Sequence, residues 1–116
     1  MKRRALSFKY AFRGIFWVFK NQINFRIEVT LGILAILFSV FLKISPSEWL
    51  IVILLIAFVL SAEIFNSIIE EVASKFPIDH MREITKDMAA GFVLILAIAS
   101  FIIGIIIFLP KILALL

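Results

Sequence analysis

The segment Ser61-Ala-Glu63-Ile-Phe-Asn66-Ser67-Ile-Ile-Glu70-Glu71 carries several polar residues, yet it continues without a break from an apolar run that begins at Trp49. At about 100° per residue, its polar residues at offsets of zero, three, four and seven share one face of a helix: Glu63, Asn66, Ser67 and Glu70. A charge near the bilayer centre costs roughly 2.5–3.5 kcal/mol on insertion scales. We therefore expect this stripe to face protein or water, and its cost indicates catalysis or ion handling.

Composition indicates that this helix belongs to a membrane protein. The 116 residues are 64% hydrophobic, whereas soluble domains are roughly 45–50% apolar. Because lipid offers no hydrogen bonds to the backbone, the sequence predicts an all-α integral membrane protein with a single domain over residues 1–116. Cysteine is absent, which excludes disulfides and leaves the redox compartment open. We expect no nucleic-acid partner.

Four helical segments are predicted. Three apolar segments are expected to span the membrane, at residues 23–42, 49–70 and 88–109. The first must reach back to about residue 23, because its uncharged part, 29–42, is only about 21 Å long against a hydrocarbon core of roughly 30 Å. Residues 7–20 space aromatic and apolar side chains as on one helix face and predict an amphipathic helix in the membrane surface, with a plain anchor as the alternative.

The distribution of basic residues predicts the orientation. Ten lie before the first span or in the polar loop 71–87: Lys2, Arg3, Arg4, Lys9, Arg13, Lys20, Arg26, Lys75, Arg82 and Lys86. Two lie on the opposite side, Lys43 and Lys111. By the positive-inside rule, the N-terminus and the 71–87 loop are cytoplasmic.

The helical rise predicts a site with two layers. Glu28 and Glu63 each lie 15 residues from the outer turn, about 22 Å deep. A second group lies about 31–35 Å from the outer surface. The sequence thus predicts a buried acidic layer of Glu28, Glu63 and Asn66, and an interfacial layer of Gln22, Glu70, Lys86 and Asp87. A lipid hydroxyl could meet a cytoplasmic polar ligand between these layers.

Motifs of soluble nucleotide-binding enzymes are missing. The chain has four glycines and no glycine-rich phosphate loop, so a phosphate site would have to be built from side chains. His80 is the only histidine and makes no metal cluster. Small residues such as Gly32, Ala35 and Ser39 favour close helix packing rather than chemistry.

Two motifs carry a family resemblance. Glu63-Ile-Phe-Asn66-Ser-Ile-Ile-Glu70 and the later Lys86-Asp87-Met-Ala-Ala-Gly resemble the signature of the prokaryotic diacylglycerol kinase and undecaprenol kinase family. Phe8-Lys-Tyr10-Ala-Phe-Arg13 and Asn24-Phe-Arg26-Ile resemble that family's N-terminal helix and the start of its first span. The resemblance covers nearly the whole chain. It implies a homotrimer in the bacterial inner membrane, with active sites between subunits, that transfers the γ-phosphate of ATP to a lipid hydroxyl.

The resemblance also implies roles for single residues. Glu63 would be the base that takes the hydroxyl proton, and Asn66 would position the reacting groups. Glu70 would hold Mg²⁺ or another divalent cation, Lys86 would neutralise phosphate charge, and Tyr10 and Asp87 would line the nucleotide site. Three positions depart from the family pattern, since a metal-ligating Glu falls at Gln22, an Asp falls at Ser74 and the Ala before the Lys86-Asp87 pair falls at Thr85.

Three functions remain open on the sequence, beside the alternative that Glu63 is a purely structural acid that hydrogen-bonds between helices. The first is the lipid kinase. The second is a member of the family that has lost catalysis and acts as a binding or structural protein, which Gln22 and Ser74 motivate. The third is a small proton-coupled transporter with Glu63 as its relay. The sequence does not separate undecaprenol from diacylglycerol as substrate, although the Phe-Lys-Tyr-Ala-Phe version resembles Gram-positive members that tend toward undecaprenol.

Overall fold

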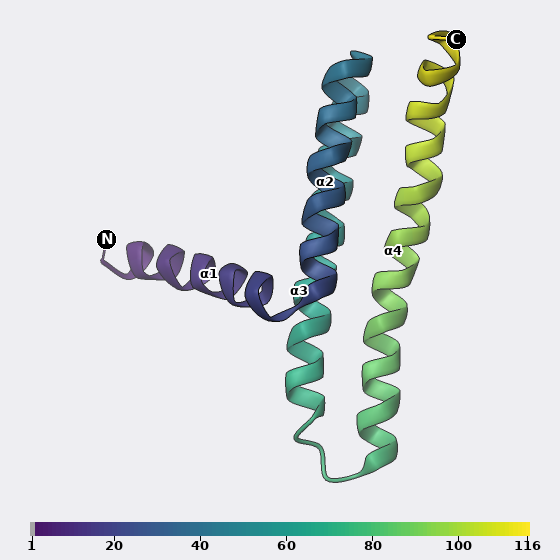
Figure 1. Ribbon diagram of the computed structural model, residues 1–116. Helices are drawn as coiled ribbons and strands as arrows, with labels where there is room; N and C mark the ends of the chain where they lie inside the picture. The colour runs from purple at the N-terminus through teal and green to yellow at the C-terminus, as the bar shows by residue number, and fades with distance from the viewer. Residues whose placement is uncertain (1) are drawn as a thin grey trace.

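The computed structural model describes residues 2–116, so Met1 of the predicted domain lies outside the described residues. These residues form four α-helices: α1 Lys2–Asn21, α2 Ile23–Leu42, α3 Pro46–Ala73 and α4 Asp79–Ala114. The three long helices run alongside one another, and α1 projects sideways from the start of α2 (Figure 1). The prediction of an all-helical chain is confirmed.

The helices α2, α3 and α4 are each long and apolar enough to cross a membrane. They contain 20, 28 and 36 residues, and about 20 residues suffice for a hydrocarbon core of roughly 30 Å. The prediction of three long apolar helices is therefore confirmed. α3 and α4 extend further than the predicted spans 49–70 and 88–109.

The polar segment 71–87 is mostly helical, whereas the sequence predicts a loop there. α3 ends at Ala73 and α4 begins at Asp79, which leaves residues 74–78 as the connection. Arg82 pairs with Asp79 and donates a hydrogen bond to the Phe76 carbonyl, so the first turn of α4 binds the connection. A helix can include charged residues that have such partners, and hydropathy alone therefore misplaces the start of α4.

The opposite end of the bundle, where α2 turns into α3 and α4 terminates, we call the turn end. Lys43 adopts a left-handed conformation (φ 52°); its N–H donates to the Val40 carbonyl, and the Ile44 N–H donates to the Ser39 carbonyl. The side chain of Ser45 accepts a hydrogen bond from the Glu48 N–H at 3.2 Å, while the Glu48 carboxylate accepts one from the Ser45 N–H at 2.9 Å. This capping box, with Pro46 in the first turn, starts α3.

Two interhelical contacts close the turn end. The Lys111 ammonium lies 3.0 Å from the Glu48 carboxylate and joins the last part of α4 to the first turn of α3. Ile44, Val52 and Ile107 form a buried apolar cluster beneath this ion pair. The turn, the cap and the cluster together fix the register of the three long helices at this end.

The corner between α1 and α2 is held by Arg26. Its guanidinium donates to the carbonyl oxygens of Lys20 at 2.8 Å and Phe19 at 3.2 Å, which are among the unpaired carbonyls at the end of α1. Gln22 is the extended residue at the corner, with φ −118° and ψ 109°. The direction of α1 is thus set by a side chain of the next helix.

Candidate functional site

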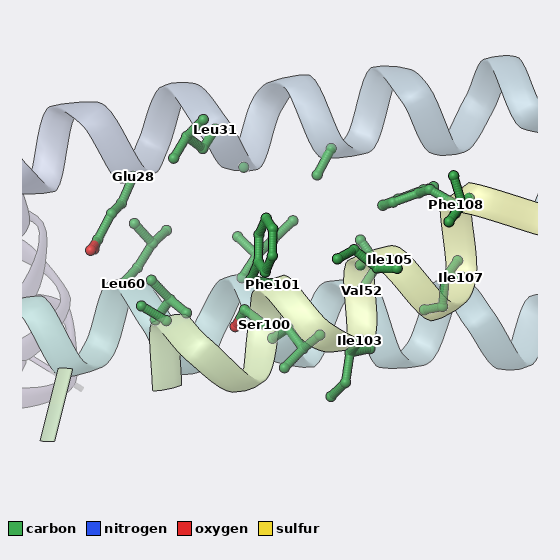
Figure 2. Close-up of a pocket in the computed structure, with 18 of the residues that line it drawn as sticks. Glu28, Leu31, Val52, Leu60, Ser100, Phe101, Ile103, Ile105, Ile107 and Phe108 are labelled. Carbon is green, nitrogen blue, oxygen red and sulfur yellow. The ribbon is translucent and has the colours of Figure 1, made fainter. Parts of the chain in front are cut away.

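Two acids meet where α2 packs against α3. Glu63 is a buried side chain on α3, with 5% of its surface exposed. The carboxyl group of Glu28, on α2, lies within interaction distance of it, and Figure 2 shows the Glu28 side chain pointing away from its own helix toward α3. The Glu28 Oε2 atom is buried and has no hydrogen-bond partner in residues 2–116. The predicted buried acidic layer is therefore a pair of neighbouring carboxyl groups.

Asn66 and Glu70 form the next part of the polar stripe on α3. The Asn66 Nδ2 atom lies 3.4 Å from Glu70 Oε1, a long hydrogen bond. The Asn66 Oδ1 atom is buried and lacks a partner within the described residues. One turn away, the Ser67 hydroxyl donates to the Glu63 backbone carbonyl at 2.9 Å. The stripe thus has one buried acceptor atom that residues 2–116 do not satisfy.

Tyr10 lies in a second region, a cavity of about 410 Å³ between α1 and α3. Its lining includes Trp17 from α1 and Ser67 and Glu71 from α3. The Arg13 guanidinium carbon lies 5.9 Å from the centre of the Tyr10 ring, and the ring is exposed. The lining of this cavity combines aromatic side chains with one acid, Glu71, and Ser67 connects it to the polar stripe.

Lys86 and Asp87 lie on α4, two turns after its start. Lys86 is half-buried and Asp87 is exposed. Further along α4, Phe92 packs edge-to-face against Phe65 of α3, with ring centres 5.6 Å apart. Among the described residues, no hydrogen bond or ion pair joins Lys86, Asp87 or Gln22 to Glu70. Within residues 2–116, Glu28 therefore lies beside Glu63 and Asn66 bonds to Glu70, while Lys86, Asp87 and Gln22 form no hydrogen bond or ion pair with Glu70.

The acids do not form a ready metal cluster. In the part of the chain that the structure describes, no three His, Asp or Glu side chains gather as ligands. A complete cage is unnecessary for Mg²⁺, which usually binds through one or two carboxylates together with substrate phosphates. Glu70, oriented by the hydrogen bond from Asn66, is an oxygen ligand of the right kind. The donor set therefore fits a cation that arrives with a phosphate ligand.

An apolar groove of about 600 Å³ extends from Glu28 toward the turn end, between α2, α3 and α4 (Figure 2). Glu28 is the only charged residue in its lining. Ser100 also lines the groove, and its hydroxyl oxygen is buried without a partner among residues 2–116. The sequence analysis missed Ser100, although a serine inside an otherwise apolar span is a signal for it.

Small residues permit the close approach of α2 to α3 beside the groove. A Cβ atom added to Gly32 would lie 3.2 Å from the Ile56 Cγ2 atom, which is tighter than an ordinary contact. Gly32 and Ala35 both line the groove. Their predicted role in packing agrees with this position.

Comparison with known proteins gives consistent matches along nearly the whole chain. A family model described as prokaryotic diacylglycerol kinase matches residues 9–108. An undecaprenol kinase of Bacillus subtilis is 34% identical over 113 residues, which cover 96% of this chain and 92% of the relative. A diacylglycerol kinase of Synechocystis sp. is 33% identical over 113 residues, covering 95% of this chain and 65% of the relative. No solved structure matches the chain.

Proposed function

Because the chain belongs to the prokaryotic diacylglycerol kinase family and is thus a lipid kinase, we propose that it transfers the γ-phosphate of ATP to the hydroxyl group of undecaprenol or diacylglycerol. The observation that carries this proposal is the position of Glu63. Its neighbour Glu28 lines the apolar groove, and Ser67, one turn along α3, lines the cavity beside Tyr10. Glu63 is thus a buried carboxyl group whose neighbours line two separate spaces, the apolar groove and the cavity beside Tyr10.

In this reaction, Glu63 takes the proton of the lipid hydroxyl as its oxygen attacks the γ-phosphorus of ATP, and ADP leaves. Phosphoryl transfer depends mainly on positioning and charge neutralisation, so a small helical site is chemically sufficient. Asn66 orients the reacting groups, and its partnerless buried oxygen is available to a donor. Lys86 neutralises phosphate charge, while Tyr10 and Asp87 line the nucleotide site.

Glu70 would hold Mg²⁺, with Gln22 as the second predicted ligand. Bound there, the cation would neutralise charge on the ATP phosphates. Gln22 is a weaker candidate, since its amide is a poorer Mg²⁺ ligand than a carboxylate and it sits at the corner between α1 and α2. Glu70 therefore carries the metal proposal.

The same proposal places α1, residues 74–78 and the start of α4 on the cytoplasmic side, where ATP is found. The excess of basic residues in these segments supports this orientation. We further propose an amphipathic surface role for α1 and assembly into a homotrimer. In support of a trimer, Gln22, Lys86 and Asp87 form no hydrogen bond or ion pair with Glu70 within residues 2–116, so a neighbouring subunit would complete the site.

The test is phosphate transfer by the purified protein in lipid vesicles. With ATP labelled at the γ-phosphate and Mg²⁺, we expect label in the lipid product when undecaprenol or diacylglycerol is present, and a side-by-side assay identifies the preferred alcohol. Nucleotide and lipid binding without transfer would instead favour a non-catalytic role, which the departures at Gln22 and Ser74 motivate. Proton flux without ATP turnover would favour a transporter.

A further inference from the structure

We propose that Glu28 is a positioning residue for Glu63: the two carboxyl groups share one proton, and this hydrogen bond holds one oxygen of Glu63 so that the other faces the lipid hydroxyl. The inference rests on the proposed function, because it takes Glu63 as the base. It assigns a role to an acid for which the family signature quoted above has no place. It also explains why the chain keeps two acids at one depth in an apolar helix pair.

The first argument is the position of the two carboxyl groups. They come from different helices and meet at a buried contact, with Glu63 only 5% exposed. Two ionised carboxylates in contact repel each other, and the repulsion is stronger where water is excluded. Neighbouring buried carboxyl groups therefore commonly hold a single proton between them.

The second argument is the absence of a cation at the pair. The ion pairs within residues 2–116 are Arg82–Asp79 and Lys111–Glu48, and neither involves Glu28 or Glu63. From α4, the groove presents Ser100 and apolar side chains to Glu28. On α3, the other polar residues of the stripe beyond Ser67 are Asn66 and Glu70, which bind each other and carry no positive charge. A proton is thus the available positive charge for the pair.

The third argument concerns the alternative role of Glu28 as a metal ligand in place of Gln22. Glu28 follows Gln22 by six residues on α2, which is about 9 Å along the helix axis. Its carboxyl group contacts Glu63, whereas the proposed metal ligand is Glu70, two turns further along α3. The geometry therefore favours positioning over metal binding, and the two roles differ in their dependence on Mg²⁺.

Two substitutions of Glu28 separate these roles kinetically. Glu28→Gln keeps the size and supplies an amide N–H that can donate to the Glu63 carboxylate, whereas Glu28→Leu removes the donor. We expect Glu28→Leu to lower kcat by up to about 100-fold through misplacement of the base, with unchanged KM for ATP. Glu28→Gln should restore kcat to within a few-fold of the wild type, and Glu83→Gln on the exposed start of α4 is the matched control.

Two kinetic outcomes would overturn the positioning role. If Glu28→Gln and Glu28→Leu lower kcat equally, a hydrogen-bond donor at this position is not what Glu63 needs. If either substitution raises the Mg²⁺ concentration for half-maximal activity, Glu28 acts at the metal. A merely structural role would change protein yield and thermal stability in Glu28→Leu without the rescue of kcat by Glu28→Gln.

A spectroscopic test does not depend on activity. At neutral pH, a shared proton gives an infrared C=O band of a protonated carboxyl group. Glu28→Gln should remove this band, Glu63→Gln should shift or remove it, and Glu83→Gln should leave it unchanged. A wild type without the band, or a band insensitive to Glu63→Gln, would overturn the inference. The expected bands in a protein that phosphorylates no lipid alcohol would instead overturn the proposed function.

Discussion

The two ends of the helical bundle differ in how completely their polar groups are satisfied. At the turn end, Ser45 and Glu48 cap each other and Lys111 pairs with Glu48. In the acidic half, comprising Glu28, Glu63, Asn66 and Glu70, buried oxygens of Glu28 and Asn66 have no partner within residues 2–116. Satisfied polar groups stabilise a fold, whereas buried unsatisfied ones are costly and persist where function requires them. The comparison assigns stability to one end and chemistry to the other.

The largest expected effect tests the acidic half directly. Glu63→Gln removes the proposed base and keeps the size of the side chain, so kcat should fall about 10²–10⁴-fold. The KM for ATP should change little, because the base contacts the lipid hydroxyl rather than the nucleotide. Lipid phosphorylation by the purified variant, with the exposed Glu83→Gln as control, is the measurement. Near-normal turnover would exclude Glu63 from the mechanism.

The next effect tests whether the start of α4 belongs to the site. Lys86→Met keeps most of the stem and deletes the charge, so the KM for ATP should rise about tenfold through loss of a charge-assisted contact to phosphate. The KM for the lipid should stay close to that of the wild type. Lys75→Met, in the exposed connection before α4, is the control. If the wild type and Lys86→Met had the same KM for ATP, Lys86 would lie outside the nucleotide site.

The third prediction concerns the turn end. Ser45→Ala removes the side-chain acceptor of the capping box and should lower the free energy of unfolding by about 1 kcal/mol. Lipid phosphorylation well below the unfolding temperature should be unchanged, because the cap lies far from Glu63 along α3. Thermal unfolding in detergent measures the first effect, with Ser47→Ala as control. A loss of kcat in the folded Ser45→Ala protein would contradict the division between the two ends.

The sequence predicts the long helices and the common depth of the two acids because both depend on regular geometry. Apolar run length indicates a span, and the constant helical rise places Glu28 and Glu63 at one depth, where the structure joins them. It misplaces the start of α4, because the partners of Arg82 allow helix in a charged segment. It separates the helices 7–20 and 23–42 at residues 21 and 22, but it gives no sign of the contact that holds this corner, in which Arg26 binds carbonyls of the preceding helix. Periodicity can be read from the local sequence, whereas contacts between segments cannot.

The smallest expected effect tests the boundary of the acidic half at Gln22. A divalent cation on phosphate oxygens is held better by two carboxylates than by a carboxylate and an amide, so Gln22→Glu should lower the Mg²⁺ concentration for half-maximal activity about two- to fivefold. The metal-free protein should lose some stability, because the added acid would repel Glu70 at a partly desolvated site.

Asn24→Asp provides the matched control for Gln22→Glu, because it adds the same charge two residues away, on an exposed side chain of α2. A general electrostatic effect of the added charge would shift both Mg²⁺ titrations alike, whereas a ligand at the metal would shift only Gln22→Glu. Within residues 2–116, Gln22 forms no hydrogen bond or ion pair with Glu70. A change in the Mg²⁺ titration specific to Gln22→Glu would therefore also indicate that the assembled protein brings the corner between α1 and α2 to the metal. If the wild type and Gln22→Glu gave the same Mg²⁺ titration, Gln22 would not be a metal ligand. The acidic half would then consist of Glu28 and the α3 residues alone, and Gln22 would serve only to turn the chain.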